Sequence, residues 1–249
     1  KIRVLGCGGS FGSPLAWGRN GNIDINNTYN FRTRSSVLIN NNNQNILIDT
    51  SPDLRDQLYK AKCTKIDAVL FTHEHSDHTA GLPDMRAMSL INQSIIPSYL
   101  SADIHDSMIS NYKYIFKGVK DYSPFMTANL IQDSFFIGDN KIETFKHNHG
   151  SIDVQTYRIN NFAYSTDLKK FYENDIDKLK NLDLWIVGLL RYDSHPSHAG
   201  FDQILEYINY LKPKKTLFTH MTALLDQEDL LSKCPENVGP AHDGLEVAL

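Results

Sequence analysis

Closely spaced cysteines are missing from this chain of 249 residues. Its three cysteines, Cys7, Cys63 and Cys234, lie far apart and form no CxxC pair. An odd number of widely separated cysteines argues against a disulfide framework. We therefore expect reduced thiols and a cytoplasmic location.

A strong excess of one charge and a long apolar run are also missing. The net charge is −4, which argues against an extended basic surface for long nucleic acids. The longest apolar run, "LWIVGLL" at residues 184–190, is too short to cross a bilayer and predicts a buried strand. We therefore expect neither a long nucleic acid nor a membrane as partner.

No linker, long charge run or short repeat divides the chain, and 41% of its residues are hydrophobic. This length and composition allow one sizeable core, so we expect residues 1–249 to form a single domain. Lys1 already begins an expected strand, "KIRVL", so we also expect part of the native N-terminus to precede it.

The hydrophobic pattern predicts a mixed α/β fold with at least ten strands, enough for two sheets covered by helices. Asn40 to Asn43 separate two β-branched runs and predict a hairpin turn. Strands are expected near residues 2–5, 36–39, 45–49, 67–71, 97–100, 135–137, 141–146, 153–159, 162–165, 184–190, 216–219 and 245–248. Helices are expected near residues 52–61, 102–114, 174–181, 201–211 and 226–232.

Two of the expected helices have particular signals. Near residue 52, "SPDL" predicts Ser51 as N-cap, Pro52 at the first helical position and Asp53 in the first turn. Near residue 201, apolar side chains recur at helical spacing, at Phe201, Ile204, Leu205, Ile208 and Leu211.

The segment "FTHEHSDHTAGLP", residues 71–83, places His73, His75, Asp77 and His78 directly after an apolar run. Such side chains need hydrogen-bond partners or a metal once they leave water. In extended backbone His73 and His75 share a side, whereas the adjacent Asp77 and His78 must point differently. This pattern suits two neighbouring metal ions better than one. Imidazole and carboxylate ligands favour zinc, manganese or iron over calcium or magnesium.

Further ligand candidates lie at the ends of later strands. His149 follows one apolar run, Asp167 ends "FAYSTD", and His220 ends "KTLFTH". His147, two residues before His149, is an alternative that the pattern alone does not separate from it. The remaining histidines are His105, His195, His198 and His242, of which His105 lies within an expected helix and is interpreted as a surface residue.

The pattern H-x-H-x-D-H followed by His, Asp and His resembles the metallo-β-lactamase superfamily of binuclear hydrolases. The resemblance covers almost the whole chain, from "RVLGCGGSFGSP" to "HDGLEVAL". Within the superfamily, "NILIDTSPDL", "IDAVLFTHEHSDHTAGL", "FAYSTD" and "LFTHMT" are similar to the branch typified by phosphoribosyl 1,2-cyclic phosphate phosphodiesterase, the PhnP-like branch, a relative of ribonuclease Z.

This resemblance implies an αββα sandwich with two divalent metal ions at one edge, zinc or manganese with iron as a third candidate. It implies that His73, His75 and His149 hold one ion and that Asp77, His78 and His220 hold the other. Asp167 would bridge the two. The family's third ligand directly precedes a small residue, which favours His149, followed by Gly150, over His147.

The resemblance also implies a phosphodiesterase mechanism, in which a hydroxide shared by two metals attacks phosphorus and a protonated group assists the leaving oxygen. In the branch a histidine just before a helix is that acid, and His198 matches this place better than His195. Ser10, in a Gly-rich turn, and Arg34 are candidate phosphate contacts, although a structural turn and a surface cation explain them nearly as well. Asp49 is a candidate to orient a metal-bound histidine.

One feature of the branch is absent here. Relatives often hold a structural zinc with a cysteine trio near residues 18–32 and a histidine three residues after the final ligand. This chain has no cysteine there and has Ala223 at the second place. We therefore expect no structural zinc and a loop that is either mobile or held by packing of Trp17, Tyr29 and Phe31.

The sequence thus predicts a hydrolase of small, nucleotide- or sugar-like phosphate diesters. A glyoxalase-type thioesterase and a non-catalytic metal- or nucleotide-binding protein are the alternatives. The physiological substrate and the oligomeric state stay open, a homodimer being compatible with the sequence.

Overall fold

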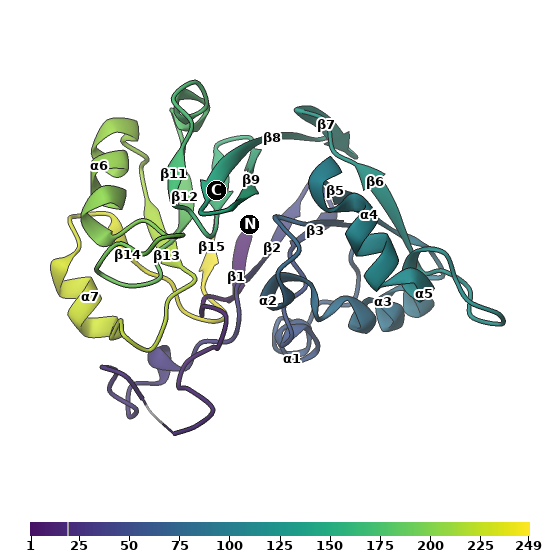
Figure 1. Cartoon of the computed structure of the whole chain (residues 1–249), viewed down its shortest axis with the longest axis horizontal. Coiled ribbons are helices and arrows are strands. Elements are labelled where there is room, and N and C mark those ends of the chain that lie inside the picture. The colour runs from purple at the N-terminus through teal and green to yellow at the C-terminus, as the bar shows by residue number, and fades with distance from the viewer. Residues whose placement is uncertain (19) are drawn as a thin grey trace.

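The computed structural model describes residues 1–18 and 20–249 and contains two β-sheets packed face to face between helices (Figure 1). Helices α1 to α5 lie beside one sheet, and α6 and α7 lie beside the other (Figure 1). This arrangement confirms the predicted αββα sandwich.

The first sheet has the strand order β15-β1-β2-β3-β4-β5-β6. Strands β2 and β3 form the predicted hairpin, whose turn residues Asn42 and Asn43 have φ of 50° and 59°. Positive φ at both turn residues matches the twist of the strands, and asparagine tolerates it. Strands β3 to β6 are parallel. The bounds are β1 Ile2–Gly6, β2 Ser36–Asn41, β3 Gln44–Ile48, β4 Ala68–Leu70, β5 Ile96–Leu100, β6 Met126–Leu130 and β15 Glu246–Val247.

The second sheet has the order β11-β8-β9-β10-β12-β13-β14, with β7 paired to β8. Its strands β10, β12, β13 and β14 are parallel, so their carboxyl ends reach the same edge. The bounds are β7 Ser134–Ile137, β8 Asn140–His149, β9 Ile152–Ile159, β10 Phe162–Ser165, β11 Lys170–Phe171, β12 Leu184–Gly188, β13 Thr216–Thr219 and β14 Val238–Pro240.

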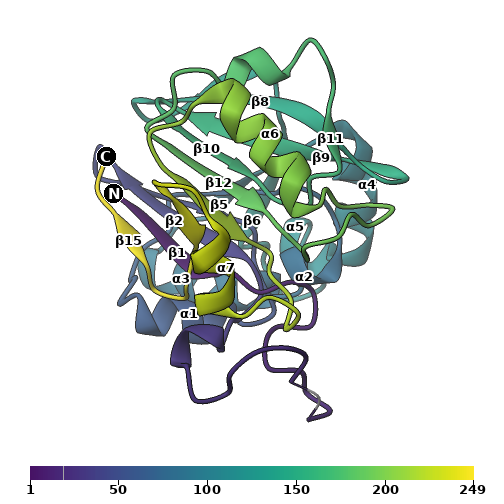
Figure 2. The ribbon, with the colours of Figure 1, turned by 90° about the vertical axis from the view of Figure 1, so that its left-hand side faces the viewer.

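The α-helices are α1 Leu54–Lys60, α2 Ser76–Thr79, α3 Met85–Asn92, α4 Ala102–Asn111, α5 Lys113–Phe116, α6 Phe201–Leu211 and α7 Gln227–Lys233. Helix α6 has the bounds that its apolar spacing predicts, and it lies across the outer face of the second sheet (Figure 2). Short 3₁₀ turns form at Thr28–Asn30, Leu82–Asp84 and Ile176–Leu179.

Two apolar clusters follow from the alternation of side chains along the strands. In β3, Ile46 and Ile48 join the cluster between the sheets, while Leu47 joins the cluster beneath the helices of the first sheet. Successive residues of a strand face opposite sides, so one strand supplies both cores. All three side chains are fully buried.

Several local predictions were wrong. Strands β6, β11 and β14 and helices α2 and α3 were not predicted, and the helix expected near 174–181 is only a 3₁₀ turn. Helix α1 begins at Leu54 with Asp53 as N-cap, not Ser51. The Ser51 hydroxyl accepts from the Asp53 N–H at 3.2 Å and donates to Gln57 Oε1 at 2.8 Å, so it shapes the turn before the helix instead.

The loop before β2 is also held differently from the prediction. Trp17, Tyr29 and Phe31 are 60%, 49% and 50% exposed and supply little packing. Instead the buried Arg32 guanidinium donates to the carbonyls of Leu225 and Thr222, at 2.7 and 3.3 Å. It also donates to the side chains of Asn30 and Gln227, at 3.0 and 3.3 Å.

We expect Arg32→Leu to lower the free energy of unfolding by about 2–4 kcal/mol, because four oxygens in buried or part-buried hydrogen bonds lose a charged donor. Urea denaturation measures this. Arg55→Leu is the matched control, since Arg55 is largely exposed and should shift the value by no more than about 0.5 kcal/mol. Equal stability of the two variants would show that the Arg32 network does not hold the loop.

Candidate metal centre

The predicted ligands come from the ends of strands in both sheets. His73 and His75 follow β4, Asp77 and His78 lie in α2, and His149 is the last residue of β8. Asp167 follows β10 and His220 follows β13. The parallel carboxyl ends therefore bring distant parts of the chain to one edge of the sandwich.

Three of the strand-end residues have left-handed backbone. Asp49, Asp167 and His220 have φ of 62°, 54° and 57°. This region costs a non-glycine residue of order 1 kcal/mol, and such strain concentrates at functional sites. Three such residues at one edge mark this edge as the candidate site.

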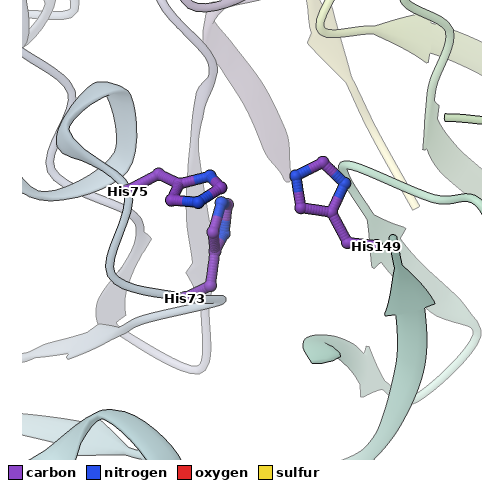
Figure 3. A group of neighbouring side chains, drawn as sticks. All are labelled: His73, His75 and His149. Atoms are coloured by element: carbon purple, nitrogen blue, oxygen red, sulfur yellow. The ribbon is translucent and has the colours of Figure 1, made fainter. Parts of the chain in front are cut away.

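One group of side chains consists of His73, His75 and His149. A ligand atom from each lies within 4.8 Å of the others. Figure 3 shows the rings of His73 and His75, from the segment that leads into α2, facing the ring of His149 across a common space. Three imidazoles that converge in this way can hold one metal ion.

A second group consists of Asp77, His78 and His220, whose ligand atoms also lie within 4.8 Å of one another. Asp167 lies between the two groups. Its Oδ2 is 3.3 Å from His78 Nε2, and its Oδ1 is 3.4 Å from His220 Nε2 and 3.7 Å from His149 Nε2. Oδ1 thus lies near a histidine of each group and Oδ2 lies near the second group, so this carboxylate contacts both groups, as a bridging ligand would.

Hydrogen bonds from the surroundings fix how three of the imidazoles are oriented. His78 Nδ1 donates to Asp49 Oδ2 at 2.7 Å, and His149 Nδ1 donates to the Ser197 carbonyl at 2.9 Å. His73 Nδ1 donates to Thr72 Oγ1 at 3.0 Å, and that hydroxyl donates to Asp49 at 2.8 Å. Each bond leaves the Nε2 lone pair free for a metal.

The residues fit a metal because buried nitrogens lack partners. Nε2 of His73 and Nε2 of His78 are inaccessible to water and have no hydrogen bond. A buried polar atom without a partner is costly, so such atoms indicate a missing ligand. The donor set of imidazoles and carboxylates suits zinc, manganese or iron.

The electrostatics of the centre also favour cations. Burial opposes the charged form of Asp167, but His220 and His78 more than offset this and hold its pKa well below its usual range. Burial lowers the pKa of His73, and burial together with His149 lowers that of His75. Burial opposes the charged form of His78, but Asp49 and Asp167 more than offset this and raise its pKa, so a metal bound there would displace a proton from its imidazole.

The structure separates His149 from His147. His147 Nε2 donates to the Thr166 carbonyl at 2.8 Å, and its Nδ1 accepts from Thr156 Oγ1 at 2.9 Å. Both nitrogens of His147 are thus occupied, and burial lowers its pKa to about 4. His105 lies in α4 beside Asp106, outside the two groups.

His198 lies next to the centre, whereas His195 lies farther out. The His198 ring is 4.7 Å from that of His149 and 5.4 Å from that of His220, and its Nε2 is 3.9 Å from Asp167 Oδ1. His195 Nδ1 instead bonds Ser197 Oγ at 2.9 Å. Burial lowers the pKa of His198 to about 3.

The two candidate phosphate contacts, Ser10 and Arg34, are outside the ligand groups. Ser10 is exposed in its turn, and Arg34 Nε pairs with Asp53 Oδ2 at 3.0 Å. Arg34 lines a cavity of about 750 Å³ together with Phe11, Tyr29 and other residues, none of them a predicted ligand. Their contact with phosphate stays a prediction.

Sequence reasoning missed three residues that support the centre, Thr72, Ser197 and Lys169. Thr72 directly precedes His73 and bonds both His73 and Asp49. A hydroxyl beside a candidate ligand is a usable signal. Ser197 acts through its carbonyl and Lys169 contacts a loop far along the chain, so no local pattern reveals them.

Comparison with known proteins agrees with this geometry. Residues 44–221 match the family model of the beta-lactamase superfamily domain. The chain belongs to this superfamily. Its members are hydrolases, and the grouped histidines and aspartates of this chain could hold metal.

A solved diphosphatase of the PhnP family is 28% identical, with a TM-score of 0.90, over 100% of this chain and 97% of the other. Zinc-bound PqqB from Methylobacterium extorquens has a TM-score of 0.81 over 100% of this chain and 99% of its own, but at 17% identity it shows the fold alone.

A longer protein from Porphyromonas gingivalis (strain ATCC BAA-308 / W83), named octanoyltransferase, is 31% identical over 99% of this chain and 51% of its own length. The chain thus spans about half of that relative. Across the described residues, no helix combines the length and apolarity needed to cross a membrane.

We expect the wild-type chain to bind two divalent ions and Asp167→Ala to weaken binding of both, because Asp167 lies between the two groups. Metal analysis after dialysis measures the bound ions per chain. Asp103→Ala is the control, since Asp103 is half exposed and pairs with Lys146. Two tightly held ions in Asp167→Ala, or three in the wild type, would contradict this assignment.

Proposed function

We propose that this protein is a metal-dependent phosphodiesterase that acts on small, nucleotide- or sugar-like phosphate diesters. The observation that carries the proposal is the complete set of seven ligand candidates, with Asp167 between the other six and a further buried histidine, His198, beside them. The similarity to a diphosphatase of the PhnP family supports phosphorus as the reacting centre.

In this proposal His73, His75 and His149 would hold one ion, Asp77, His78 and His220 would hold the other, and Asp167 lies between the two groups. Two divalent ions held there would lower the pKa of water and stabilise negative charge that develops at phosphorus. Asp49 keeps His78 and, through Thr72, His73 in the tautomers that present Nε2.

His198 is the proposed general acid for the leaving oxygen. Its low pKa means that it is neutral at pH 7 before substrate binds. A phosphate diester carries a negative charge, which favours the imidazolium and raises the pKa in the complex. His198 would then take up a proton with the substrate and donate it to the leaving oxygen.

We expect the metal-loaded protein to hydrolyse diesters and to leave thioesters untouched. Bis-p-nitrophenyl phosphate, cyclic nucleotides and a ribose 1,2-cyclic phosphate are the diester probes, and a glutathione thioester tests the glyoxalase-type alternative. The thioester also tests whether acyl chemistry is shared with the octanoyltransferase relative. Thioester turnover without diester turnover would overturn the proposal, and no turnover of either would favour a binding protein.

We expect His198→Ala to lower turnover of diesters with poor leaving groups by about 10²–10⁴-fold, because these need protonation of the leaving oxygen. Nitrophenyl esters should lose less, and metal content should stay unchanged. His105→Ala is the control, since His105 pairs with Asp106 in α4. Equal losses for both ester types, or lost metal, would show that His198 is not the acid.

The remaining predictions belong to this proposal. We expect a small phosphate ester as the partner of this protein and neither a long nucleic acid nor a membrane. A homodimer is compatible with the proposed function. The three cysteines are unpaired in the structure, as expected for a protein of the cytoplasm.

A further inference from the structure

Lys169 lies two residues after Asp167 and reaches across to the loop that carries His198. Its Nζ is 2.8 Å from Ser194 Oγ, 2.6 Å from the His195 carbonyl and 3.4 Å from the His198 carbonyl. An ammonium group has three N–H donors and no acceptor, so these three oxygens use all of its hydrogen-bonding capacity.

The backbone on both sides of this contact is held as well. The Lys169 N–H donates to the Asn148 carbonyl at 2.8 Å, which ties Lys169 to the end of β8. The Ala199 N–H donates to the Leu168 carbonyl at 2.6 Å. The backbone at Leu168 and Lys169 is therefore fixed on both sides, and the Lys169 side chain starts from a defined place.

Two residues of the loop, His195 and His198, pair through their backbones. The N–H groups of His195 and His198 donate to each other's carbonyls, at 3.0 and 3.3 Å. Those same two carbonyls accept from Lys169. The ammonium group therefore joins both carbonyls of this paired turn, and a further contact of the turn with a distant strand is the bond between the Ser197 carbonyl and His149 of β8.

This turn carries two functional groups. His198 stands between the rings of His149 and His220. The Ser197 carbonyl accepts from His149 Nδ1 at 2.9 Å and so sets the tautomer of that ligand candidate. Any shift of the turn would move the proposed acid and loosen His149 together.

We propose that Lys169 is a positioning residue that clamps the turn at residues 194–198, and so places His198 for proton transfer and His149 for metal binding. The proposal deepens the proposed function and rests on it for the role of His198. Lys169 itself contacts neither the reacting atoms nor a ligand candidate's side chain in this arrangement.

The test compares Lys169→Met, which keeps the stem but removes the donors, with Lys170→Met. Lys170 is exposed in β11 and is the matched control for the lost charge. Lys169→Arg keeps charge and donors and should restore part of each property. The rate of amide hydrogen exchange in the peptide that spans residues 191–201, measured by mass spectrometry, reports the stability of the turn independently of activity.

We expect exchange in this peptide to be at least about tenfold faster in Lys169→Met, because charge-assisted hydrogen bonds are lost. Metal affinity should fall about tenfold, because the Ser197 carbonyl would then orient His149 less firmly. Turnover of diesters with poor leaving groups should fall about 10- to 100-fold, with a smaller loss for nitrophenyl esters.

Unchanged exchange in Lys169→Met would overturn the clamp. Faster exchange with equal losses for both ester types would show that the contact is structural and does not position the acid. If the wild type hydrolyses no diester, the proposed function fails, but the clamp can still be tested by hydrogen exchange and metal affinity. If Lys169→Met then equals Lys170→Met in both measurements, the clamp is overturned as well.

Discussion

The centre depends on how its buried imidazoles are held, and the Asp49 carboxylate holds two of them. It accepts from His78 Nδ1 directly and from the Thr72 hydroxyl, which in turn accepts from His73 Nδ1. Burial raises the pKa of Asp49, and contact with His78 works against that rise. One carboxylate of the first sheet thus determines that both histidines present Nε2 to the same space.

The second sheet supplies the complementary half. Asp167 follows β10 and His220 follows β13, two parallel strands separated by β12, and both residues have left-handed backbone. The contact between sheets is direct, since Asp77 Oδ2 lies 3.2 Å from His220 Nε2. Neither sheet alone contains either complete group of ligand candidates, so the site exists only when the sandwich has formed.

The sequence predicted site residues correctly where a candidate ligand comes directly after an apolar run. The apolar runs before His73, Asp167 and His220 predicted strand ends, and the structure places all three at the common edge. The choice between His147 and His149 needed the structure, because it depends on which partners each imidazole meets across the sheet. Strand β6 and the Ser51 turn were missed because pairing and side-chain contacts, rather than local pattern, decide them.

The loop before β2 is held by an organic cation. Arg32 joins the loop to the segment after His220 through the carbonyls of Thr222 and Leu225. A guanidinium presents several donors in one plane and stays charged when buried, so it can bind several oxygens at once. The Asp226 carboxylate adds to this by accepting from the Asn30 side chain at 2.7 Å. Because His220 lies two residues before Thr222, the same network that holds the loop also restrains the backbone of a ligand candidate, which ties the stability of the loop to the geometry of the centre.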